Sequence, residues 1–148
     1  MNLAEHFSFD ELTKSSSHPE LVALNRRKAV SYMDNIQLVA NQLEILRHSI
    51  GDLPITVRSG FRCEELNKAV GGAKRSGHLS GLAADIVANG LSVKELFEHI
   101  KSNPIHHIAK VIREKRASHW VHISFSQEDV KTPEYLVTVD GRNYERVY

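Results

Sequence analysis

The stretch SGHLSGLAADI, residues 76–86, carries the feature that guides our interpretation of the whole chain. It places His78 between small residues and then sets Asp85 between an alanine and an isoleucine in an apolar run. A buried carboxylate is costly unless it is hydrogen-bonded or binds a metal. The run LAADIVA around Asp85 is typical of a strand, and the turn residues Asn89 and Gly90 follow it. We therefore expect a strand whose aspartate needs a partner from elsewhere in the fold.

Helical patterns lie on both sides of this strand. From Pro19 to Ile50 apolar residues recur at steps of three and four, and Gly51 is a suitable C-cap. A capping box begins a second helix that extends to about Lys101, and a similar pattern predicts a short helix near the N-terminus. The two capping boxes are Ser92 with Glu95, and Ser8 with Glu11. CEELNKAV, residues 63–70, predicts a further short helix.

The remaining apolar segments predict strands. They are LPITVRS, residues 53–59; IAKVIRE, residues 108–114; HWVHISFS, residues 119–126; and YLVTV, residues 135–139. Helices in the N-terminal half followed by short strands indicate an α+β fold, in which helices pack on a small, mainly antiparallel sheet. We interpret residues 1–148 as a single domain whose motif-bearing core covers about residues 54–126.

The composition excludes several classes of function. The formal net charge is +1, which gives no indication of nucleic-acid binding. No apolar run is long enough to span a bilayer, and the N-terminus has no signal-peptide pattern, so we expect a protein that is cytoplasmic at synthesis. One cysteine excludes an internal disulfide and a cysteine-rich zinc site, whereas nine histidines make histidine-based metal binding plausible. A monomer is the favoured state.

Strand alternation suggests how a metal site could form. Asp85 shares a strand face with Ala83 and Val87, and His122 shares one with Trp120 and Ser124. If the two strands are neighbours, Asp85 and His122 converge, and His78 can join them from its loop. Two imidazoles and a carboxylate that leave one position open are typical of catalytic zinc. The alternatives are a structural, hydrogen-bonded Asp85 and a solvated surface His78.

The same residues resemble a known family. SGHLSGLAAD fits S-x-H-x-x-G-x-A-x-D in full, and WVHIS, residues 120–124, resembles the second motif of the same family. This is the pattern of peptidase family M15, the zinc D-alanyl-D-alanine carboxypeptidases and related peptidoglycan peptidases. RSGFRCEELNKAVGGAKRSGHLSG, residues 58–81, and FSFDELTKS, residues 7–15, are similar to phage and prophage members of subfamily A.

The resemblance implies a role for each matching residue. His78, Asp85 and His122 would bind one Zn²⁺ ion in a cleft. Arg62 would bind the substrate carbonyl or carboxylate, for which a guanidinium fork is well suited. Ser76 would orient the loop or touch substrate. Trp120 would line the cleft, with simple packing as its alternative.

The catalytic base is where the sequence departs from the family pattern. Many members have an acidic residue three positions before the last zinc histidine, and this chain has His119 there. A histidine can act as a base near neutral pH. However, positions three apart in an unbroken strand point to opposite faces, so His119 reaches the metal only if the strand begins at Trp120 or contains a bulge. Glu114, at the end of the neighbouring strand, is the alternative base, and His119 is favoured.

The expected function is that of a zinc metallopeptidase acting on bacterial peptidoglycan stem peptides or cross-links. Endopeptidase activity is favoured over D-Ala-D-Ala carboxypeptidase activity, since removal of a terminal D-alanine does not cut cross-links. The phage-like motifs suggest an endolysin-like protein that reaches the wall after holin-type release, or a component of a virion. The alternative is a non-catalytic module on the same fold that binds peptidoglycan or serves in phage tail assembly.

Overall fold

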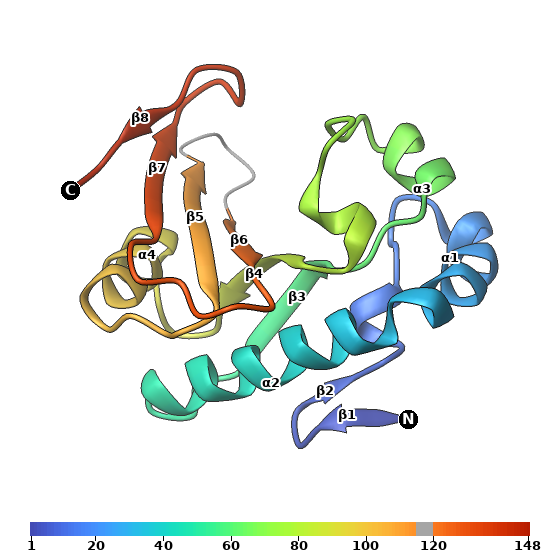
Figure 1. Cartoon of the computed structure of the whole chain (residues 1–148), viewed down its shortest axis with the longest axis horizontal. Coiled ribbons are helices and arrows are strands. Elements are labelled where there is room, and N and C mark those ends of the chain that lie inside the picture. Colours follow the sequence, from blue (N-terminus) through green and yellow to red (C-terminus); the bar gives the residue numbers. More distant parts are fainter. Residues whose placement is uncertain (115–119) are drawn as a thin grey trace.

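The computed structural model describes residues 1–114 and 120–148, and a mixed sheet forms its centre (Figure 1). Within these residues the sheet has six strands in the order β3-β4-β6-β5-β7-β8, and only β5 and β7 pair in parallel. The strands are β3 (Ile55–Ser59), β4 (Ala83–Ala88), β5 (Ile108–Glu114), β6 (Val121–Phe125), β7 (Glu134–Thr138) and β8 (Glu145–Arg146). The predicted α+β fold with a mainly antiparallel sheet is confirmed.

The helices precede the sheet or connect its strands. The α-helices are α1 (Val22–Ala29), α2 (Met33–Ser49), α3 (Glu64–Ala69) and α4 (Val93–Ser102). Short 3-10 helices are η1 (Glu11–Thr13), η2 (Pro19–Leu21), η3 (Val30–Tyr32) and η4 (Gly77–Ser80). A small hairpin of β1 (Asn2–Ala4) and β2 (Phe7–Ser8), which the sequence did not predict, lies beside α2 (Figure 1).

The prediction of continuous helix from Pro19 to Ile50 is wrong in its detail. The chain forms η2, α1, η3 and α2 in succession, because Tyr32 leaves the helical region with φ −120° and ψ 21°. The ring of Tyr32 instead lies against Phe61, with the ring centroids 5.2 Å apart. The end of the segment is as predicted: α2 ends at Ser49, and Gly51 has a left-handed φ of +79°.

One hydrophobic core joins the helices to one face of the sheet. It contains Leu43 and Leu46 of α2, Leu96 of α4, and Ile86 and Ile123 from the neighbouring strands β4 and β6. The predicted capping box fixes the start of α4: Ser92 accepts a hydrogen bond from the Glu95 amide, and Glu95 accepts one from the Ser92 amide. Because side chains alternate along β4 and β6, the residues between the core positions point to the opposite face.

Candidate metal centre

Strand pairing brings Asp85 and His122 together. β4 and β6 are antiparallel neighbours, and Asp85 is directly opposite His122 in their register. Paired residues project from the same face of a sheet, so both side chains lie on the face away from the core. His122 Nδ1 is 2.8 Å from Asp85 Oδ1, and His122 Nε2 is 3.0 Å from the hydroxyl of Ser124. The condition that the sequence set for convergence of these two residues is therefore met.

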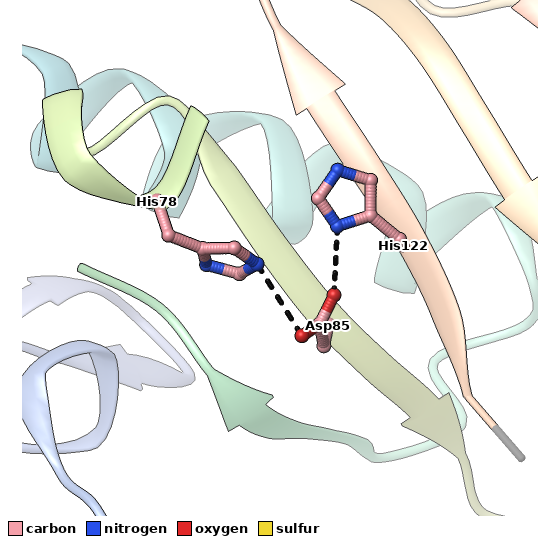
Figure 2. A group of neighbouring side chains, drawn as sticks. All are labelled: His78, Asp85 and His122. Carbon is pink, nitrogen blue, oxygen red and sulfur yellow. Dashed lines mark hydrogen bonds and ion pairs between the residues drawn. The ribbon is translucent and has the colours of Figure 1, made fainter. Parts of the chain in front are cut away.

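His78 reaches the same place from η4 (Figure 2). Its Nε2 atom lies 3.3 Å from Asp85 Oδ2, so the carboxylate stands between the two imidazoles. Ser76 is the N-cap of η4 and accepts a hydrogen bond of 3.2 Å from the backbone amide of His78. Gly81 ends η4 with a left-handed φ of +76°, which returns the chain to β4.

The segment from Gly60 to Arg62 holds His78 at two points. The carbonyl of Gly60 accepts a hydrogen bond of 2.7 Å from His78 Nδ1. The amide of Arg62 donates one of 3.0 Å to the carbonyl of His78. Since a carbonyl only accepts, the first of these bonds places a proton on Nδ1, and in the neutral imidazole Nε2 then carries a lone pair. Metal-binding histidines are commonly oriented in this way through their second ring nitrogen.

The electrostatics of the three residues favour a bound cation. Burial lowers the pKa of His78, whose side chain is only 1% exposed, and so favours its neutral form. Burial alone would raise the pKa of Asp85, but the hydrogen bond with His122 acts in the opposite direction, and the pKa is held below its ordinary value. A neutral Nε2 and an ionised carboxylate oxygen therefore face each other as two acceptors, without the alignment of a hydrogen bond. A cation between them would satisfy both.

The spacing of the three groups also fits a metal. One ligand atom from each of His78, Asp85 and His122 lies within 4.8 Å of the others. Two ligands around a tetrahedral zinc at about 2.0–2.2 Å lie roughly 3.3–3.6 Å apart, so small adjustments suffice to close the site. Ser124 can accept the Nε2 proton of His122, which would leave Nδ1 free to bind the ion. The residues therefore fit one metal ion with a position left open.

A cleft of about 260 Å³ opens beside this centre. Asp85 lines it together with Arg62 and Trp120, two of the three residues to which the sequence assigned substrate contact; the third, Ser76, is not among the described lining residues. Arg62 is partly buried, and its Nε atom has no hydrogen-bond partner among the described residues. Burial lowers the pKa of its guanidinium, and the charge of Asp85 acts in the opposite direction. Trp120 precedes β6, which begins at Val121.

The two candidate bases differ in what the structure describes. His119 lies outside the described residues. Glu114 is the last residue of β5 and is 8% exposed. Ile112 is opposite His122 in the β5–β6 register, and strand alternation places Glu114 on the same face as Ile112. Glu114 is therefore a diagonal neighbour of His122 on the face that carries the metal ligands.

Sequence reasoning did not find several residues that build this centre. Gly60 acts through its carbonyl, and Ser124 of the WVHIS segment acts through its hydroxyl, a role that the sequence did not assign to it. Asn25 of α1 is fully buried and binds the backbone on both sides of Arg62: it donates to the carbonyl of Phe61 and accepts from the amide of Cys63. It also donates to the carbonyl of Thr13. A polar residue in a helix gave no signal of this role.

The comparison with known families agrees with this geometry. The profile of the family described as "Peptidase M15" matches residues 5–124. The chain belongs to the peptidase M15 family. The match begins before β2 and ends inside β6, so it includes all three candidate ligands.

A curated protein is similar to part of this chain. This M15 chain is 36% identical over 83 residues to the zinc D-Ala-D-Ala carboxypeptidase of Streptomyces albus G. The match covers 56% of this chain and 31% of that protein, so the M15 chain spans about a third of the length of the relative. Within residues 1–114 and 120–148, no helix is long and apolar enough to cross a membrane.

Proposed function

We propose that this protein is a zinc peptidase that hydrolyses peptide bonds in the stem peptides or cross-links of bacterial peptidoglycan. The observation that carries the proposal is the set His78, Asp85 and His122, in which two acceptors face each other beside a cleft. Family membership and the zinc enzyme of Streptomyces albus G support zinc as the ion and wall peptides as the substrate.

Different residues of the chain would bind the substrate, line the cleft and transfer protons around the ion. Bound zinc polarises a scissile carbonyl and lowers the pKa of water. Arg62 lies on the cleft wall, its buried Nε has no hydrogen-bond partner among the described residues, and its guanidinium can bind the carbonyl oxygen or a carboxylate of the peptide. Trp120 forms another part of the wall. A general base takes the proton of the attacking water and passes it to the leaving amine.

Glu114 is the base that the described residues offer. Its carboxylate belongs to the strand next to His122 and lies on the ligand-bearing face, as an acid–base group near the metal must. The motif position favours His119 instead. Exchange of each residue in turn separates the two, and the expected outcome is given in the Discussion.

We also propose that the cleavage is endopeptidic. The support is the resemblance of residues 7–15 and 58–81 to phage-type members, because lysis requires cuts that open the network. Such a protein would act at the wall after holin-type release or as part of a virion. The competing activity is that of a carboxypeptidase, which removes a terminal D-alanine.

The test measures the zinc content of the protein and identifies the products that it releases from peptidoglycan. Purified protein is analysed for zinc, then incubated with intact sacculi and with a soluble pentapeptide ending in D-Ala-D-Ala. We expect about one zinc per chain, falling turbidity, and muropeptides with new internal ends identified by mass spectrometry. His78→Ala should lose both zinc and turnover, whereas the exposed His106 provides a matched control, and His106→Ala should keep both.

The alternative outcomes are distinct. Free D-alanine from the pentapeptide with intact sacculi would refute the endopeptidase proposal and leave a carboxypeptidase. Zinc without turnover on either substrate would refute the enzyme proposal and favour a non-catalytic, peptidoglycan-binding module.

A further inference from the structure

The cleft beside the metal centre is strongly cationic. Lys14, Arg58 and Arg62 all line it, and Asp85 supplies the one carboxylate among the described residues of its lining. A metal ion bound to Asp85 would neutralise that charge. The described part of the cleft would then present three basic side chains to a substrate and no acidic one.

Strand alternation places Arg58 on the face of this cleft, and a β-bulge keeps the next residue there as well. Val57 is opposite Ile86, and Ser59 is opposite Asp85, so Arg58 is the extra residue of β3 at this point. Thr56 is opposite Val87, which shares a strand face with Asp85, so alternation puts Arg58 on that face. The bulge interrupts the alternation after Arg58, and Ser59 therefore lies opposite Asp85 and also lines the cleft.

Among the described residues, the basic side chains of the cleft have no hydrogen-bond or ion-pair partner. Elsewhere in the chain arginines form ion pairs, as Arg26 does with Asp10 and Arg146 with Glu134. Within residues 1–114 and 120–148, no ion pair or side-chain hydrogen bond involves Lys14, Arg58 or Arg62. Three positive charges line a cleft of about 260 Å³ and repel one another. An anionic ligand bound in the cleft would reduce that repulsion.

We propose that Arg58 and Lys14 form a second anion subsite, which binds a substrate carboxylate other than the group held by Arg62. This inference rests on the proposed function and specifies its substrate class: stem peptides whose internal carboxylates are free rather than amidated. Arg58 and Lys14 thus determine specificity and take no part in bond cleavage.

The experiment uses two soluble stem peptides that differ only in whether their internal carboxylates are free or amidated. For the zinc-loaded protein we expect the amidated peptide to have a KM about tenfold higher, with kcat changed by less than about twofold. Exposed ion pairs are weak, so Arg58→Gln should raise KM for the free peptide about fivefold and leave KM for the amidated peptide nearly unchanged. Lys14→Gln should act in the same direction. Arg58→Lys should retain most of the preference.

Arg27 provides the matched control, since it is exposed on α1 and does not line the cleft. Arg27→Gln should leave both KM values unchanged. Circular dichroism and denaturant unfolding verify that each variant is folded, and the Arg58→Lys protein tests the charge without shortening the side chain greatly.

Calorimetric binding of both peptides to the zinc-loaded protein separates this inference from the proposed function. Preference for the free peptide in binding, lost in Arg58→Gln, supports the subsite even if neither peptide is hydrolysed. Equal KM and equal affinity for the two peptides would overturn the subsite, even if both are cleaved. An equal loss of affinity for both peptides in Arg58→Gln would also overturn it, because that result indicates a merely structural role.

Discussion

Gly60 offers the sharpest test of how the fold supports the metal centre. A Cβ atom placed on Gly60 would lie 2.4 Å from the carbonyl oxygen of Leu12 and 3.0 Å from its carbonyl carbon. Both obstacles are backbone, so no side-chain rotation relieves them. The two segments are also joined there by a hydrogen bond of 2.8 Å from the Phe61 amide to the same oxygen. Gly60→Ala must therefore separate the backbones by roughly 1 Å.

The size of the effect follows from the bonds that this movement strains. Overpacking of a tight site costs about 1–3 kcal/mol, and a weakened buried hydrogen bond adds about 1 kcal/mol. We expect the free energy of unfolding to fall by about 2–4 kcal/mol. The carbonyl of Gly60 also moves away from His78 Nδ1, and loss of such a bond to a metal ligand lowers metal affinity by about 10–100-fold.

Two measurements on Gly60→Ala check this reasoning: urea unfolding followed by circular dichroism, and zinc affinity from competition with a chelator. Gly51 is the control, because it has a left-handed φ of +79° and open space around its Cβ position. Gly51→Ala should cost about 1 kcal/mol of backbone strain and leave zinc affinity unchanged. If Gly60→Ala binds zinc as tightly as the unmodified protein does, the Gly60 carbonyl does not orient His78.

Three further predictions concern the ligands, the base and the support of Arg62. His122→Ala should abolish stoichiometric zinc by inductively coupled plasma analysis while the fold survives, because the helices and apolar strands do not depend on the metal. Glu114→Gln should lower turnover at least ~10²-fold with zinc retained, and His119→Ala should lower it much less; the reverse result would identify the histidine as the base. Asn25→Ala leaves three buried backbone groups without their side-chain partner, so it should reduce the free energy of unfolding by about 3 kcal/mol in urea titrations.

The ligand set was predictable because local pattern and chemistry agreed. Alternation in LAADIVA and in HWVHISFS put Asp85 and His122 on defined faces, and the register of β4 and β6 confirms their convergence. The capping box of Ser92 and Glu95 likewise acts through residues three apart, which sequence inspection detects directly. In each case the type and spacing of the side chains indicate the interaction that forms.

The supporting contacts could not be predicted because they depend on backbone atoms or on distant segments. Any residue type supplies a carbonyl, so nothing in the sequence distinguishes Gly60 as the acceptor for His78. The bulge at Arg58 inserts one residue without a proline or glycine at the inserted position. β5 and β7 pair in parallel although β6 lies between them in the sequence. The alternation of side chains within a strand shows which face is buried but not which strands become neighbours.

In the proposed enzyme, the segment from Arg58 to Arg62 would link metal binding to substrate recognition. Its first residue is the bulge side chain in the cleft, its third orients the ring of His78, and its last both binds the His78 carbonyl and lines the cleft. Asn25 and the carbonyl of Leu12 fix this segment from the N-terminal side. A displacement of the segment would therefore change a candidate metal ligand and two cations of the cleft together. For this reason a variant at Gly60 should alter both zinc affinity and peptide KM, whereas a variant at Arg58 should alter KM alone.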